Sequence, residues 1–155
     1  MKYTLLLSTL ALSLAAVSTI AHAGERAYLD NKDIAKVVTK AESLIADTHQ
    51  TGCVVVVNES GALLFAQHLD NAPLGCMDAS IAKARTSALY HTPSVNLMTR
   101  VASGATPLLS LPNAVALGGG YPLTINGVVV GAVGVSTPKQ DLDNQSSEAA
   151  AAELK

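Results

Sequence analysis

The dipeptide Asn126-Gly127 is the feature of this sequence that most restricts its fold. It stands between two runs rich in strand-forming residues, "YPLTI" at 121–125 and "VVVGAVGVS" at 128–136. An Asn-Gly pair between such runs is a strong hairpin signal, because both residues tolerate the positive φ angles of a type I′ turn. The segment therefore predicts two antiparallel strands joined by a two-residue turn.

A second hairpin is predicted nearer the N-terminus. "CVVVVN" at 53–58 is an unbroken run of strand formers, typical of a strand that is covered on both faces. The turn residues "NESG" follow at 58–61, and "ALLFAQHLD" from Ala62 returns as a second strand. The two hairpins together predict an antiparallel sheet.

Helices are predicted around these hairpins. Asp30 caps a first helix, in which apolar residues such as Val37 and Ile45 recur at helical spacing. A second helix is predicted over 77–90. A third is predicted over 94–103, with its inward residues expected to be Val95, Met98 and Val101 or Ala102.

The last helix has its own start signal. Thr137 is expected to be its N-cap, Pro138 its first residue, and Gln140 the residue that closes a capping box. The resulting order is helix, two strands, two helices, two strands, helix. This order predicts one α+β domain, an antiparallel sheet with helices packed on it.

The N-terminal residues resemble a signal peptide. Met1 and Lys2 form a short basic region, an apolar run spans 5–20, and Ala21-His22-Ala23 is an A-x-A cleavage signature. We expect cleavage after Ala23, a single domain over 24–155, export to the periplasm or secretion, and no stable membrane anchor. The alternative is an uncleaved anchor, for which the run is short and has no charged stop.

Composition excludes nucleic acid as a partner. Ten Lys and Arg face twelve Asp and Glu without a basic block, and Trp is absent. The sequence also has no G-x-S-x-G, H-E-x-x-H, C-x-x-C or Walker motif, so we expect no enzyme activity. Cys53 and Cys76 leave two interpretations open: a disulfide in an oxidising compartment, or a buried apolar residue and a free thiol.

Three segments carry a resemblance to a known family. They are "IAKARTSAL" at 81–89, "LGGGYPLTINGVVVGAVGVS" at 117–136 and "PKQD" at 138–141. In this order they resemble the GlcG/HbpS-like haem-binding family, which also supplies the C-terminal domain of some corrinoid adenosyltransferases. The resemblance covers about 29–154. One departure is visible, because the family usually has further glycines where Ser136 here runs directly into Thr137.

The resemblance implies a profilin-like α/β sandwich that associates into dimers or larger rings and binds haem or a related tetrapyrrole. Some members of the family act as extracellular partners of sensor kinases. A haem iron needs a His, Met, Cys or Tyr ligand in a dry slot. The candidate residues for this site are His91, His68, Met98, Thr86, Lys83, Arg85, Gly118, Gly119 and Gly120.

Each candidate also has a structural interpretation. His91 suits a helix C-terminus, His68 a strand edge and Met98 the core. Thr86 is an oxygen ligand only by resemblance, and a helical threonine commonly bonds a local carbonyl. Lys83 and Arg85 would neutralise propionates or lie on a solvated or intersubunit surface.

The three consecutive glycines at 118–120 would form an anion nest or a bend that needs positive φ.

Three hypotheses of function follow, in this order. The first is an exported binding protein for haem or a related tetrapyrrole. The second is a subunit that binds a small organic acid or a partner protein without haem. The third is an enzyme of small acids or of haem breakdown.

Overall fold

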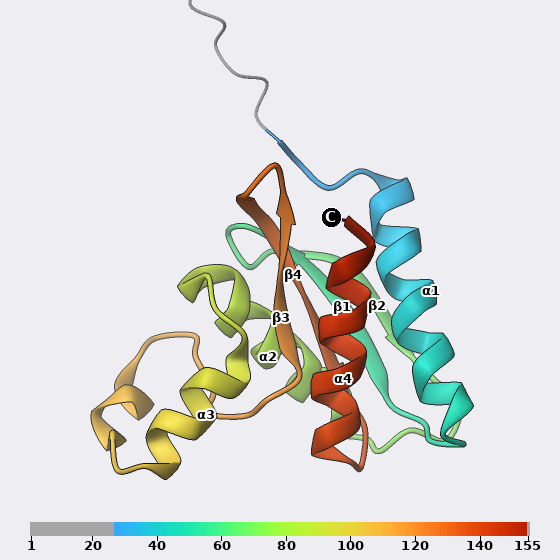
Figure 1. Ribbon diagram of the computed structural model, residues 1–155. Coiled ribbons are helices and arrows are strands. Elements are labelled where there is room, and N and C mark those ends of the chain that lie inside the picture. The colour runs from blue at the N-terminus through green and yellow to red at the C-terminus, as the bar shows by residue number, and fades with distance from the viewer. Residues whose placement is uncertain (1–26, 155) are drawn as a thin grey trace, which may run out of the picture.

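The computed structural model describes residues 27–154, so the expected signal peptide at 1–23 lies outside the described residues (Figure 1). Over this range no helix is both long and apolar enough to cross a membrane. The helices and strands follow in this order: α1 (Asn31–Asp47), β1 (Cys53–Asn58), β2 (Leu63–His68), α2 (Cys76–Tyr90), α3 (Ser94–Ala102), η1 (Thr106–Ser110), β3 (Gly120–Ile125), β4 (Val128–Ser136), α4 (Gln140–Ala151) and η2 (Ala152–Leu154).

The strands form one antiparallel sheet in the order β2-β1-β4-β3. Both predicted hairpins are confirmed. Asn126 and Gly127 have φ angles of 51° and 77°, as a type I′ turn requires. Strand β1 lies in the middle of the sheet, and its first residue, Cys53, lies opposite His68 on one side and Ser136 on the other.

Helices cover both faces of the sheet, with α1 and α4 on one face and α2 on the other (Figure 1). The alternation of β1 explains this arrangement. Val54 and Val56 pack with α1 and α4, whereas Val55 and Val57 pack with α2. All four valines are fully buried. The predicted α+β class is therefore confirmed.

Two glycines bring α2 unusually close to the sheet. A Cβ atom on Gly120 would collide with the Lys83 carbonyl oxygen, and one on Gly134 would collide with the Ser80 carbonyl oxygen. Helix backbone can approach strand backbone this closely only where side chains are missing. Gly120 and Gly134 of this hairpin thus allow α2 to pack closely on the sheet.

The predicted inward face of α3 is wrong. Ser94 and Leu97 are the buried residues, while Met98 is half-buried and Ala102 is exposed. The reason lies at the start of the helix, where the Ser94 hydroxyl accepts a hydrogen bond of 2.8 Å from the Gly120 N–H. This bond turns a polar residue toward the sheet, so the apolar spacing does not mark the buried face.

The predicted start of α4 is also wrong, because the helix begins at Gln140 and its N-cap is Lys139. Thr137 forms a local turn instead, in which its hydroxyl accepts a bond of 3.0 Å from the Lys139 N–H. The Thr137 N–H donates to a carboxylate oxygen of Asp143 at 2.7 Å. Asp143 is thus the residue that bonds back to the turn, in place of the predicted Gln140.

Candidate functional site

Two cavities follow one another along the side of α2 that faces α3 and the segment 111–115. The larger measures about 370 Å³ and is lined by Asp78, Ile81, Ala82, Arg85, Asn113, Ala114 and Val115. The smaller measures about 180 Å³ and is lined by Thr86, Tyr90, Thr92, Asn96, Leu97, Arg100 and Leu111. We call these two cavities together the α2 groove. Its size falls in the range of small-molecule sites.

Hydrogen bonds from α2 hold the opposite wall of the α2 groove in place. The Thr86 hydroxyl accepts from the Val115 N–H at 2.9 Å and donates to the Ala82 carbonyl at 2.8 Å. The Tyr90 hydroxyl donates to the Pro112 carbonyl at 2.7 Å. These bonds fix the segment 111–115 against the helix between the two cavities.

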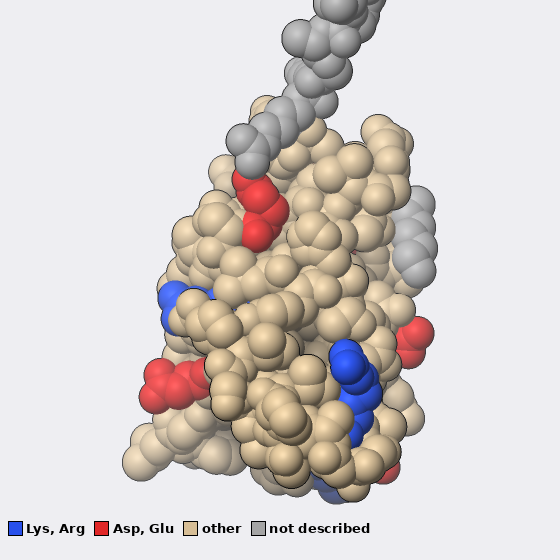
Figure 2. Space-filling model, turned by 90° about the vertical axis from the view of Figure 1, so that its left-hand side faces the viewer, with Lys and Arg blue, Asp and Glu red and all other residues tan. Residues whose placement is uncertain are grey.

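The α2 groove combines apolar walls with two cations. Arg85 lines the larger cavity and Arg100 the smaller, and these are the only arginines in residues 27–154. Arg85 donates from Nε to the Gly61 carbonyl at 3.1 Å, which leaves its terminal nitrogens available. The face seen from the side of α3 carries few charged residues (Figure 2). Such a site suits an apolar molecule with acidic groups, because guanidinium groups pair well with carboxylates.

The predicted iron ligands do not converge on the α2 groove. Thr86 is fully buried and its hydroxyl is occupied by the two bonds above. His91 is the C-cap of α2, exposed and left-handed at φ 50°, and lines neither cavity. Met98 is half-buried on α3, and His68 ends β2 beside the cysteines. From the predicted set the structure brings Arg85 and Thr86 together at the groove.

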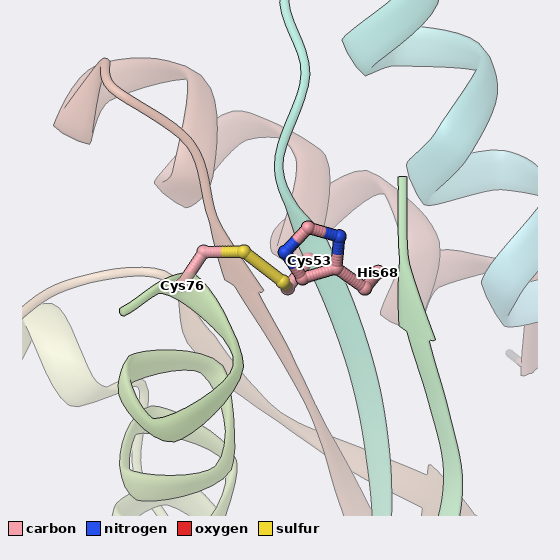
Figure 3. A group of neighbouring side chains, drawn as sticks. All are labelled: Cys53, His68 and Cys76. Atoms are coloured by element: carbon pink, nitrogen blue, oxygen red, sulfur yellow. A yellow bond between two sulfur atoms is a disulfide. The ribbon is translucent and has the colours of Figure 1, made fainter. Parts of the chain in front are cut away.

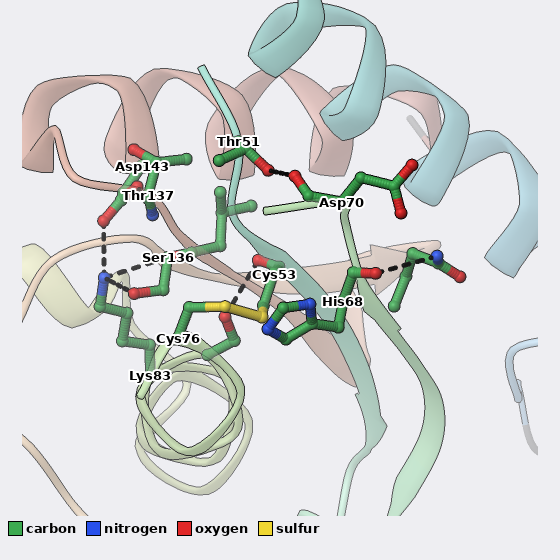
Figure 4. Close-up of a disulfide and its surroundings, with 12 residues drawn as sticks. Thr51, Cys53, His68, Asp70, Cys76, Lys83, Ser136, Thr137 and Asp143 are labelled. Atoms are coloured by element: carbon green, nitrogen blue, oxygen red, sulfur yellow. Dashed lines mark hydrogen bonds and ion pairs between the residues drawn. A yellow bond between two sulfur atoms is a disulfide. The ribbon is translucent and has the colours of Figure 1, made fainter. Parts of the chain in front are cut away.

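Lys83 is not on a surface, contrary to expectation. Its side chain is 4% exposed, and Nζ lies 2.7 Å from Asp143 Oδ2 and 3.1 Å from the Val135 carbonyl (Figure 4). Burial raises the pKa of the Asp143 carboxyl, while its bonds with Lys83 and with Thr137 oppose the rise. The Lys83 charge is therefore paired with Asp143 inside the protein.

The three glycines at 118–120 are buried and line neither cavity. Gly119 has a φ of +103°, so the bend that needs positive φ is present. The Gly120 N–H is bonded to Ser94, and the Gly119 carbonyl accepts from the Val135 N–H at 2.8 Å. The Gly120 N–H, one of the donors that an anion nest would use, therefore has an internal partner, and the positive φ at Gly119 fits the bend.

Sequence reasoning missed Tyr90, Arg100 and Asp78 as lining residues. A signal for two of them exists in the sequence. Asp78, Ala82, Thr86 and Tyr90 recur every four residues, so they follow one stripe of the helix. No comparable signal places Arg100, because its position depends on how α3 packs.

The cysteine question is settled in favour of a disulfide between Cys53 and Cys76, with Cα atoms 5.4 Å apart (Figure 3). It connects the start of β1 with the start of α2. The His68 imidazole lies beside it, and the ligand atoms of the three side chains are all within 4.8 Å of one another. None of these three residues lines either cavity of the α2 groove.

Residues 29–152 match the family model described as haem degrading protein HbpS-like. An uncharacterised 15.0 kDa protein of Citrobacter freundii, encoded in the dhaT-dhaS intergenic region, is 33% identical over 99 residues, which cover 61% of this chain and 70% of that protein. Protein GlcG of Escherichia coli K12 is 35% identical over 84 residues, which cover 54% of this chain. The match spans 62% of the length of GlcG.

Solved structures share the fold. A double mutant of Streptomyces reticuli HbpS superposes with a TM-score of 0.77 and 28% identity, covering 95% of this chain and 99% of that one. A PduOC–haem complex superposes with a TM-score of 0.74 and 22% identity, covering 83% of this chain and 96% of that one. At 22% identity the second likeness concerns the fold alone.

Proposed function

This chain belongs to the HbpS-like family, and we propose that it is an exported, self-associating protein that binds haem or a related tetrapyrrole in the α2 groove. The observation that carries the proposal is the pairing of apolar walls with Arg85 and Arg100 along one helix. A tetrapyrrole has the matching chemistry, a flat apolar ring with carboxylates at its edge. The solved PduOC–haem complex, which shares this fold, supports the same assignment.

The residues of the α2 groove fit the ring and the propionates better than they fit the iron. In residues 27–154 no histidine or methionine lines either cavity. His91 stands in the chain between Tyr90 and Thr92, which both line the smaller cavity, so we assign it as the first ligand to test. The Tyr90 phenol is the alternative, because it lies in the cavity and phenolates ligate haem iron in other proteins.

The direct test is a titration of the purified protein with hemin, followed by the Soret band. We expect a saturable shift. His91→Ala should change the position of the band if this histidine is the ligand, while His49→Ala, in the exposed turn after α1, should leave it unchanged. A protein that gives no shift at any hemin concentration does not bind haem, and the proposal then fails.

Haem breakdown is a second candidate, because the matching family model is described as haem degrading. It is distinguished in the same cuvette. If the haem complex keeps its Soret band after a reductant is added in air, the protein only binds haem. Steady loss of the band together with a new product indicates that the protein degrades haem. A groove that binds small organic acids instead would give no Soret shift with hemin, and calorimetric titration with those acids would show their binding.

Self-association and export complete the proposal. Leu109 in η1 and Leu117 before β3 are 61% and 43% exposed, and a second copy would cover them. Light scattering of the purified protein tests this, with a monomer mass as the contrary result. Export is tested by fractionating cells that express the full chain and sequencing the mature N-terminus, which we expect at Gly24.

A further inference from the structure

Outside the α2 groove, Cys53, His68 and Cys76 form a group of side chains that could bind a metal ion. These residues come from three different elements: the start of β1, the end of β2 and the start of α2. Their sulfur and nitrogen atoms lie within 4.8 Å of one another, and Figure 3 shows the imidazole ring beside the two sulfur atoms. Two thiolates and an imidazole form a ligand set that proteins use for Zn²⁺.

The fold holds these three positions without help from the disulfide. Cys53 and His68 are opposite one another in the β1–β2 register. The Ser80 hydroxyl, one turn into α2, donates to the Cys53 carbonyl at 3.0 Å, and the Thr51 hydroxyl donates to the Asp70 carbonyl at 2.7 Å (Figure 4). Cleavage of the sulfur–sulfur bond would therefore leave the ligands near one another.

We propose that the reduced form of this protein binds one Zn²⁺ ion through Cys53, His68 and Cys76, and that oxidation of the two thiols releases it. Two neighbouring ligand atoms on a tetrahedral zinc ion are separated by about 3.3–3.8 Å, as follows from the usual zinc–sulfur and zinc–nitrogen distances. The observed spacing needs only small side-chain movements to reach these values. Three protein ligands leave a fourth position for water or another small ligand.

The reaction balances as follows. A dithiol or phosphine reductant delivers two electrons, and two protons come from water or the dithiol, so that the disulfide becomes two thiols and the reductant is oxidised. Zn²⁺ then displaces the two thiol protons and binds both thiolates and the neutral imidazole. An oxidant that takes two electrons from the sulfur atoms re-forms the disulfide and frees the ion, which itself undergoes no redox change.

The burial of the group determines how the site would behave. Cys53 is fully buried and Cys76 is 3% exposed, whereas His68 is exposed at the edge of the sheet. Solvent therefore reaches the group from the side of His68, and the fourth ligand of a bound ion would enter from there. Residues 27–154 contain no free cysteine, so no other thiol in this range competes for the metal.

The experiment uses Co²⁺ as a spectroscopic probe of the anaerobically reduced protein. We expect one equivalent to give thiolate charge-transfer and tetrahedral d–d absorption, and Zn²⁺ to displace it. The oxidised protein should give neither signal. His68→Ala should weaken binding by more than the roughly 10–100-fold that loss of an outer-shell partner costs. The matched control His49→Ala should bind as the wild-type protein does.

A second readout is independent of the spectrum. Zn²⁺ should raise the unfolding temperature of the reduced wild-type protein, because a ligand that binds only the folded state stabilises it. It should not raise that of a Cys53→Ala/Cys76→Ala double variant. The proposal is overturned if the reduced, folded protein gives no thiolate signal, or if His68→Ala binds as tightly as the wild-type protein.

Discussion

Lys83 on α2 and Asp143 on α4 form a buried ion pair, with 2.7 Å between Nζ and Oδ2. The two helices lie on opposite faces of the sheet, so the pair connects them around the end of β4 (Figure 4). Asp143 is held on its other oxygen by the Thr137 N–H. The pair thus holds both helices, the turn at Thr137 and the last strand together, because Lys83 Nζ also donates to the Val135 carbonyl in β4.

Replacement of Lys83 by Met should destabilise the protein strongly at neutral pH. The change leaves the Asp143 carboxylate buried without a counter-charge, which typically costs about 3–5 kcal/mol. Urea denaturation measures the loss in the free energy of unfolding. The Lys83→Met/Asp143→Asn double variant removes both charges, keeps an oxygen for the Thr137 N–H and should be more stable than the single variant. A Lys83→Met variant as stable as the wild-type protein would refute the role of the pair.

The stability of Lys83→Met should improve as the pH falls. Burial raises the pKa of Asp143 above its ordinary value of 3.8, and without Lys83 less opposes that rise. An acid whose folded-state pKa is raised contributes stability that is fully present below 3.8 and lost as the pH rises through the folded value. The difference in the free energy of unfolding between Lys83→Met and the double variant should therefore become smaller as the pH is lowered. A difference that does not depend on pH would contradict this prediction.

Gly120→Ala should destabilise the protein although it adds a single methyl group. The new Cβ would collide with the Lys83 carbonyl oxygen, a backbone atom that cannot move without shifting α2. Overpacking of this kind costs about 1–3 kcal/mol, measured by urea denaturation. Gly75→Ala is the matched control, because its Cβ would meet nothing within 4 Å, and its effect should stay within about 0.5 kcal/mol. Equal stabilities of the two variants would contradict the close helix contact.

Arg85→Ala and Arg100→Ala should each weaken hemin binding if the α2 groove receives the propionates. Bonds to charged groups are worth about 1.5–3 kcal/mol when buried, and exposure reduces this, so we expect roughly 3–10-fold for each. Fluorescence or Soret titration gives the affinities, and Arg→Lys variants should retain part of the binding. Lys139→Ala, a cation that lines neither cavity, should have no effect. Unchanged affinity in both arginine variants places the ligand elsewhere.

Reduction of the disulfide in the absence of metal should lower the free energy of unfolding by about 3 kcal/mol, as expected for a loop that joins residues 23 apart. The comparison is a pair of denaturation curves with and without a phosphine reductant. The Cys53→Ala/Cys76→Ala variant should be insensitive to the reductant. Sensitivity of that variant would show that the reductant acts by another route.

The sheet could be predicted from local patterns because its strands and turns are determined by residues that are close together in the sequence. The valines of β1 favour a strand in any context where both faces are covered, and Asn126-Gly127 determines its own turn. Asp30 also caps α1 as predicted, since its carboxylate accepts from Lys32 and Asp33 two and three residues ahead. Each of these signals acts over a few residues, so the sequence alone is sufficient to predict the strands, the turn and the helix cap.

The failures all involve partners distant in the chain. Lys83 looks like a surface cation until Asp143, 60 residues later, is brought to it. The same carboxylate accepts a hydrogen bond from the Thr137 N–H, which holds Thr137 in the turn, and α4 therefore begins only at Gln140. The α2 groove escaped prediction for a related reason, because its outer wall is an irregular segment that bonds to Thr86 and Tyr90 from 29 and 22 residues away.

The close seating of α2 has a consequence for whatever enters the groove. That helix is fixed from beneath by backbone contact at Gly120 and Gly134, at its start by the link to Cys53, and midway by Lys83. It cannot retreat to admit a thicker guest. The groove can therefore widen only by movement of its outer wall, residues 94–116. The hydrogen bonds that Thr86 and Tyr90 make with this wall oppose such movement, so their strength limits the size of the molecules that the groove accepts.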